Sequence, residues 1–471
     1  MRDLVSATGA AIAPGAIVVR IIATSAANPA IPAPVSGVAM RRAAYLPAEV
    51  SRGPVDFLVG FGVLLLFGLS GYALEYFGMP YLSDGGSILT KLHPSLYVFA
   101  LTLGVAIIGN PEPITYATSL FSRRLGSVAV IAACGVIYVF VARYKPTMSA
   151  AYLGDAMISA ALVALLLADS PAGARLWLAR LIHAIVIANA MLAIVEVATH
   201  WRLFPFGIKG DYQVWDYRAT AFFGHPLDGA LVTGVYAVIL MTARDIPGLA
   251  NGLRLPVILL CMAAMPAIGA RTSFAIVYGV AAVVVGLSVL RFLRGHGTSH
   301  ATLLASLVGA ALVPVVAVAA YQLGYLDGFL GRFESDSGSA ETRVTLYNLF
   351  SHYGFHEMLT GYSPIEYRTR IRIEGLETGV ENAWVGHLMQ FGIPLSVMLW
   401  CALAALLADL FRSTGRYAVL PTLFMLLVIS TSVGISGKTT MLVMPITVML
   451  ILLGEADATR MARKPAFSPT P

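Results

Sequence analysis

Arginines and carboxylates that could act on an anionic substrate gather in one polar stretch of an otherwise apolar chain. Residues 324–381 hold two histidines, many carboxylates and five arginines, Arg332, Arg343, Arg368, Arg370 and Arg372. A guanidinium group stays charged at any pH and binds phosphate oxygens through parallel hydrogen bonds. We interpret this stretch as a long loop over a pocket that is built by the surrounding helices.

A second group of polar residues stands where an apolar run begins. Pro226 suits the first turn of a helix, which places His225 at or near the N-cap. Asp228 then favours the positive end of that helix. The group is explained either as a helix start alone, or as an anion site made by Arg218 and the helix N-terminus.

Arg271 lies between two apolar runs with almost no loop around it. A charge at membrane depth costs roughly 2.5–3.5 kcal/mol, so such residues are usually functional or paired. The other interpretation is an arginine whose side chain reaches the lipid headgroups.

Within the long loop, apolar residues between Glu341 and Phe350 have the spacing of a short amphipathic helix, with Arg343 toward the pocket. Arg368, Arg370 and Arg372 alternate with Thr369 and Ile371. Alternation predicts an extended segment with the three arginines on one face. That face binds substrate, or it is a solvated or headgroup-facing strip.

Glu381, Asn382 and His387 stand where the next apolar run begins. Glu381 is a candidate general base if burial and arginine neighbours tune its pKa. It is otherwise a helix N-terminal charge. His387 lies further in and is either a substrate ligand or a packed, hydrogen-bonded histidine.

The composition is that of a polytopic membrane protein. Hydrophobic residues make up 58% of the 471 residues and charged residues 12%, and the mean hydropathy is +0.79, whereas soluble domains have about 25% charged residues. The net charge of +6 then marks cytoplasmic loops and not a nucleic-acid partner. Cys134, Cys261 and Cys401 fall in apolar runs, and no metal-binding spacing or Asp-x-Asp motif occurs.

Apolar runs predict an all-α fold of about 12 transmembrane helices. The predicted spans lie near 55–74, 95–109, 126–142, 152–168, 177–199, 225–243, 253–270, 272–292, 301–323, 383–409, 417–436 and 439–454. The predicted segments are a disordered cytoplasmic tail (1–52), helices one to nine (53–323), a long periplasmic loop (324–382), helices ten to twelve (383–454) and a second cytoplasmic tail (455–471). With the N-terminus inside, each cytoplasmic loop carries a pair of Lys or Arg residues, which favours cytoplasmic termini.

These segments, in this order, resemble the superfamily of O-antigen ligases and Wzy-type polysaccharide polymerases, which are bacterial integral membrane proteins. The resemblance covers roughly 200–400 and is carried by Arg218, Phe222, His225 and Pro226, then Gly269 and Arg271, then Arg343, Tyr347 and Gly361, then Glu381, Asn382 and Gly392.

The resemblance implies a GT-C-like, metal-independent, inverting glycosyltransferase in the inner membrane that needs no cofactor. Its donor would be an oligosaccharide on undecaprenyl pyrophosphate, and a chain-length regulator and a flippase are implied candidate partners. Arg218, Arg271 and Arg343 would stabilise the pyrophosphate, and Glu381 would take the acceptor proton. Candidate substrate-binding residues are His225, Arg368, Arg370, Arg372, Asn382 and His387.

One departure from the family pattern bears on the activity. Ligases commonly have a histidine where this chain has Glu381, which favours a polymerase of exopolysaccharide, capsule or O-antigen repeat units. A ligase that moves a finished glycan, and a transporter or flippase whose arginines bind an anionic solute, remain alternatives.

Overall fold

The chain divides into Met1–Ala48 and Glu49–Pro471, and every residue that can be described belongs to the second unit. The computed structural model describes residues 53–82, 88–205, 207–208, 211–212, 218–295, 308–309, 311, 315, 318, 321–322, 324–334, 344–376 and 380–455. At residues 88, 207–208, 211–212, 328 and 332–334 only the backbone is described. The predicted tail 1–52, residues 456–471 and the candidate Arg343 lie outside the described residues.

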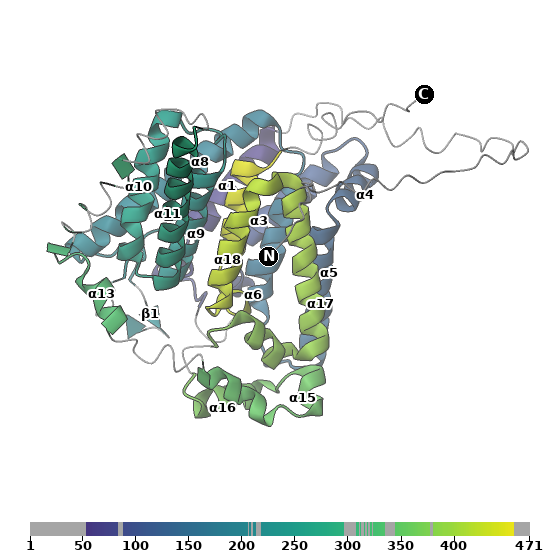
Figure 1. The fold of residues 1–471 in the computed structure, drawn as a ribbon. Coiled ribbons are helices and arrows are strands. Elements are labelled where there is room, and N and C mark those ends of the chain that lie inside the picture. Colours follow the sequence, from purple (N-terminus) through teal and green to yellow (C-terminus); the bar gives the residue numbers. More distant parts are fainter. Residues whose placement is uncertain are drawn as a thin grey trace, which may run out of the picture. The chain divides into compact units, whose positions relative to one another are not determined.

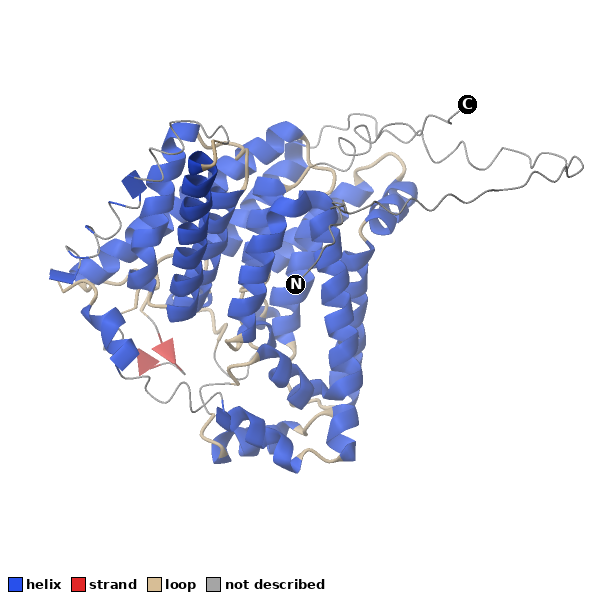
Figure 2. Cartoon of the chain, viewed as in Figure 1, coloured by secondary structure: helices blue, strands red, loops and turns tan. Residues whose placement is uncertain are grey.

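Almost all of the described secondary structure is helical (Figures 1 and 2). The elements are α1 (Gly53–Gly68), α2 (Gly71–Tyr76), η2 (Ile88–Lys91), α3 (Pro94–Ile108), α4 (Pro113–Arg123), α5 (Leu125–Tyr144), α6 (Ala151–Leu153), η3 (Gly154–Ile158), α7 (Ser159–Leu166), α8 (Ala172–Thr199), β1 (Gly207–Ile208), β2 (Asp211–Tyr212), α9 (Pro226–Thr242), α10 (Asn251–Ile268), α11 (Arg271–Leu293), α13 (Asp327–Glu334), η4 (Leu346–His352), α15 (Phe355–Thr360), α16 (Pro364–Ile373), α17 (Ala383–Thr414), η5 (Gly415–Ala418), α18 (Val419–Ser430), η6 (Gly434–Ser436) and α19 (Val443–Leu453). The strands β1 and β2 form one antiparallel pair.

The chain is a helical membrane protein. Five helical segments among the described residues are long and apolar enough to cross a bilayer: Leu125–Tyr144, Ala172–Thr199, Asn251–Ile268, Arg271–Leu293 and Ala383–Ser430. The other predicted spans coincide with shorter apolar helices, except 301–323, most of which lies outside the described residues. Helix α4, for which no span was predicted, lies between α3 and α5.

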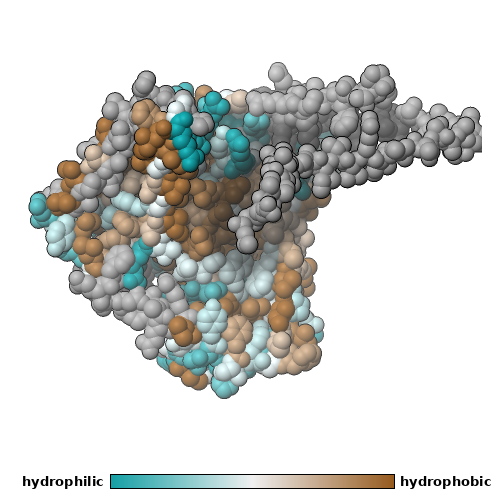
Figure 3. All heavy atoms as spheres, viewed as in Figure 1, coloured by the Kyte–Doolittle hydropathy of each residue, from teal (hydrophilic) through white to brown (hydrophobic). Residues whose placement is uncertain are grey.

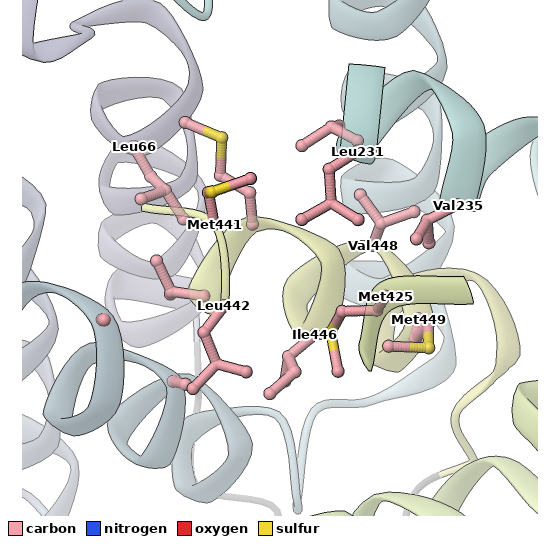
Figure 4. Packing of buried hydrophobic residues seen from close by; sticks show 14 of the residues in the cluster. Leu66, Leu231, Val235, Met425, Met441, Leu442, Ile446, Val448 and Met449 are labelled. Carbon is pink, nitrogen blue, oxygen red and sulfur yellow. The ribbon is translucent and has the colours of Figure 1, made fainter. Parts of the chain in front are cut away.

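The core is centred on α9, which is buried along almost its whole length. It packs against α8, α10, α11, α18 and α19, as expected for a helix that is apolar on all sides. Figure 4 shows Leu231 and Val235 of α9 beside Met425 of α18 and Val448 and Met449 of α19.

Apolar side chains also cover the outside of the helices, as contact with lipid requires. Val139 of α5 is 70% exposed and Val283 of α11 is 60% exposed. In Figure 3 hydrophobic residues dominate the middle of the visible face, and hydrophilic residues are more frequent at the end that carries α15 and α16.

Connections that were predicted to share a side of the membrane meet at the same end of the helices. Lys145, which follows α5, donates to the carbonyl oxygens of Tyr362 and Gln390, each at 2.7 Å. At the opposite end, Arg123 of α4 pairs with Asp169 at 2.6 Å, and Asp409 of α17 accepts from the backbone of Gly126 at 2.6 Å.

The long polar stretch is not a single loop, because its described part folds into η4, α15 and α16. Leu346–His352 forms a 3-10 helix near the predicted amphipathic helix. The extended segment predicted for Arg368, Arg370 and Arg372 is wrong, since Pro364–Ile373 is helical. Ser363 caps this helix by accepting from Glu366 N at 3.2 Å, with Pro364 in the first turn, and this local start outweighs the alternation.

Two glycines fix the crossing of α15 and α17. Gly392 has φ 75° and kinks α17, and Gly361, which ends α15, has φ 73°. A Cβ at Gly361 would lie 2.6 Å from the carbonyl carbon of Gln390. Only glycine permits this approach, and the two hydrogen bonds of Lys145 hold the same crossing.

Candidate functional site

A cavity of about 1260 Å³ lies between α16 and the ends of the membrane helices. Its walls come from the connection between α2 and α3, the connection between α5 and α6, helix α16, and the connection between α18 and α19. The cavity therefore joins segments that are far apart in the sequence.

Basic and aromatic side chains dominate the polar lining of this cavity. Four basic residues line it, namely Lys91, Arg368, Arg372 and Lys438, and five tyrosines do so, namely Tyr81, Tyr138, Tyr152, Tyr362 and Tyr367. No Asp or Glu occurs among the described residues of the lining. Such a lining favours an anionic ligand, since like charges concentrated in one cleft raise the local concentration of counter-ions.

The two lysines are held by neighbouring backbone carbonyls. Lys438 donates to the carbonyl oxygen of Tyr81, and its Nζ lies 3.8 Å from the centroid of the Tyr81 ring. Lys91 donates to the carbonyl oxygen of Pro80. Burial lowers the pKa of Lys438 to about 8, against the attraction of Asp155.

Arg368 and Arg372 stand one helical turn apart on α16, so both reach the cavity. Arg370 does not line it, and its guanidinium lies 3.9 Å from Glu366 on another side of the helix. The structure therefore brings two of the three predicted arginines to the cavity, through helical geometry.

Gln390 of α17 links several cavity walls. Its Oε1 accepts from Tyr152 at 2.7 Å, and its Nε2 donates to the Ser436 carbonyl at 3.2 Å. It also hydrogen-bonds to Tyr367 of α16. Gln390 thus fixes the hydroxyls of Tyr152 and Tyr367, and both residues remain in the lining.

The helix start that was predicted at His225 is confirmed, with Pro226 and Asp228 in the first turn of α9. His225 is the N-cap of α9 and accepts from Leu227 N at 3.1 Å, with its ring stacked on Tyr72 at 6.3 Å. Ala219 N donates to Ala267 O at 2.9 Å, so Arg218 lies beside the end of α10. Arg271 begins α11 just beyond that end. Arg218 and Arg271 thus both lie close to the C-terminal end of α10, and neither lines the cavity.

Glu381, Asn382 and His387 do not line the cavity either. Asn382 is the N-cap of α17 and accepts from the backbone of Trp384 and Val385, both at 3.1 Å. Glu381 precedes it and is half-buried. His387 is fully buried, with Nε2 3.1 Å from the Ile435 carbonyl and Nδ1 accepting from Trp400, which is the packed, hydrogen-bonded alternative.

Sequence reasoning missed Lys91, Lys438 and Tyr81. Each lysine is a single charge in a connection between two helices, and no local pattern marks it. Tertiary contacts bring these residues together, and Lys438 and Tyr81 are 357 positions apart in the sequence.

Among the described residues, no group of three or more His, Cys, Asp or Glu side chains could hold a metal ion. Comparison of the chain with protein-family models, with curated proteins and with solved structures found no match.

Proposed function

We propose that this chain is a polysaccharide polymerase of the bacterial inner membrane. It transfers a glycan from undecaprenyl pyrophosphate to a lipid-linked acceptor at the periplasmic face. The supporting observation is the cavity, which combines four basic side chains with five tyrosines at one end of the helices.

The lining suits the chemistry of this transfer. When the glycosidic bond to pyrophosphate breaks, negative charge develops on the leaving oxygens. Fixed cations in a partly dry site stabilise that charge without reorganisation. Arg368 and Arg372 supply planar guanidinium groups, and Lys91 and Lys438 supply compact ammonium groups. Tyrosine rings offer large amphipathic surfaces for the sugar.

A polymerase holds two lipid-linked chains at once, so it needs a second anion site. The candidates for that site are Arg218 and Arg271, which lie close to the C-terminal end of α10 and outside the cavity lining. Glu381 remains the candidate base for the acceptor hydroxyl, and Arg343 a further candidate for the pyrophosphate.

The test is synthesis of polymer by the purified chain in lipid nanodiscs, with a lipid-pyrophosphate-linked repeat unit as sole substrate. Arg368→Ala and Arg372→Ala each remove one charged hydrogen-bond donor, worth about 1.5–3 kcal/mol, and we expect a rate about 10- to 100-fold lower. Arg370→Ala, from the same helix but outside the lining, is the matched control.

Long polymer made at the wild-type rate by Arg368→Ala and Arg372→Ala refutes the assignment of the cavity. Donor that is moved across the bilayer without bond formation refutes the polymerase in favour of a transporter. A parallel assay adds an acceptor without a lipid pyrophosphate, and transfer only to that acceptor refutes the polymerase in favour of a ligase.

A further inference from the structure

A carboxylate lies behind the cavity wall and takes no part in the proposed transfer. Asp155 is 1% exposed and accepts from the Tyr81 hydroxyl at 2.7 Å and from the His93 backbone N–H at 2.6 Å. Tyr81 lies in the first part of the connection between α2 and α3, and His93 is its last residue. One buried side chain therefore contacts this connection at two separate points.

The backbone around Asp155 is shaped for this contact. Residues Gly154–Ile158 form a single π-helical turn between α6 and α7, and such turns are frequent at functional sites. A Cβ at Gly154 would lie 2.9 Å from Leu92 Cδ2. A side chain at position 154 would therefore have to displace the end of Leu92, the residue before His93.

The connection in turn places both lysines of the cavity. Lys91 donates to the carbonyl of Pro80 and Lys438 to that of Tyr81, so two ammonium groups are held by successive residues. The Tyr81 ring also lies under the Lys438 ammonium, a favourable contact between a cation and a ring face. Two like charges in one wall repel each other, and a ligand with two adjacent negative groups relieves that repulsion.

We propose that Asp155 is a positioning residue that acts through Tyr81, holding Lys438 beside Lys91 so that the two ammonium groups bind the two phosphates of a diphosphate group. The proposal rests on the proposed function for taking the ligand as a diphosphate ester. The same chemistry would bind free pyrophosphate, which makes the site accessible to a simple probe.

The experiment titrates inorganic pyrophosphate into the full chain in nanodiscs of phosphatidylcholine. Lys438→Gln removes the charge, and we expect affinity about tenfold lower, as for a lost hydrogen bond to a charged group. Tyr81→Phe keeps the ring and the carbonyl but loses the bond to Asp155, and we expect affinity about fivefold lower. Tyr144→Phe, at an exposed tyrosine of α5, is the control and should bind as the wild type does.

The deciding measurement is the double variant Tyr81→Phe/Lys438→Gln. If Tyr81 acts through Lys438, the double variant binds no more weakly than Lys438→Gln alone, because the effects of coupled residues are not additive. If the fold losses of affinity in the two single variants multiply in the double variant, the proposal is overturned, because Tyr81 then supports the site only through general stability. Unchanged affinity in Tyr81→Phe overturns it as well.

The same variants separate this proposal from the polymerase. Non-additive loss of pyrophosphate affinity in a chain that makes no polymer supports the positioning role and refutes the polymerase. If polymer synthesis depends on Arg368 but the affinity losses of Tyr81→Phe and Lys438→Gln multiply in the double variant, only the positioning role is refuted.

Discussion

Replacing Gly361 by alanine tests whether the crossing of α15 and α17 sets the cavity. Gly361 has φ 73° and ψ 170°, a region that is almost restricted to glycine and costs other residues about 1–3 kcal/mol. The new Cβ would also lie 2.6 Å from Gln390 C and 2.7 Å from Phe391 N. These are backbone atoms that cannot rotate away, and overpacking of this kind costs about 1–3 kcal/mol more.

The expected total for Gly361→Ala is therefore about 2–6 kcal/mol. Because Tyr362 and α16 follow directly, the shift should also separate Arg368 and Arg372 from the opposite wall. Gly375→Ala is the matched control: its φ is +66°, but nothing lies within 4 Å of the added Cβ, so it carries only the backbone strain of about 1–2 kcal/mol. Thermal melting in detergent and pyrophosphate titration measure both effects. If Gly361→Ala melts and binds like Gly375→Ala, the crossing does not set the cavity.

Three further predictions use the same protein. Burial lowers the pKa of Lys438 to about 8, and only the protonated amine attracts an anion, so pyrophosphate affinity should fall as pH rises from 7 to 9. Lys438→Arg keeps its charge over this range and should remove the part of the fall that is due to Lys438. An identical pH dependence in both proteins would contradict the role of Lys438. His387→Gln should lower the melting temperature, because both ring nitrogens have buried partners, yet leave the pH profile of polymer synthesis unchanged; a shifted profile would make His387 part of the chemistry. The third prediction uses a chain in which Cys134, Cys261 and Cys401 are replaced by alanine. In it, Arg368→Cys should react with a membrane-impermeant thiol reagent only from the periplasmic side, and Ser122→Cys of α4 only from the cytoplasmic side. Labelling of both from one side would refute the orientation.

Apolar runs predicted the positions of the helices because the side chains of each run must be buried or face lipid along its whole length. Those of α9 and α19 are buried in the core. The N-cap His225 was likewise a local signal, since Pro226 indicated it. Asn382 was predicted as a substrate-binding residue and not as the N-cap that it forms, although it stands directly before a predicted apolar run. The helix of Arg368, Arg370 and Arg372 also had a local signal, Ser363 and Pro364 followed by Glu366, but the alternation of arginines was given more weight.

The cavity could not be predicted, because no local pattern specifies it. Lys438 has a role only because it contacts Tyr81 in the folded chain. Tyr81 is in turn oriented by Asp155, which lies 74 positions away in the sequence. A single aspartate inside an apolar run forms no sequence pattern that would indicate which residue it contacts. The sequence therefore indicated the arginines of the polar stretch, and the tertiary fold added the lysines that oppose them.

The arrangement of the four cations bears on how the cavity would work. Lys91 and Lys438 belong to a wall fixed by a buried carboxylate, whereas Arg368 and Arg372 belong to a short helix whose anchor is the glycine crossing and Lys145. A diphosphate that contacts both pairs would connect these two supports and relieve the repulsion within each. Binding energy from the lipid-linked group would then tighten α16 over the sugar before transfer, so that loss of either pair should weaken transfer more than it weakens binding of free pyrophosphate.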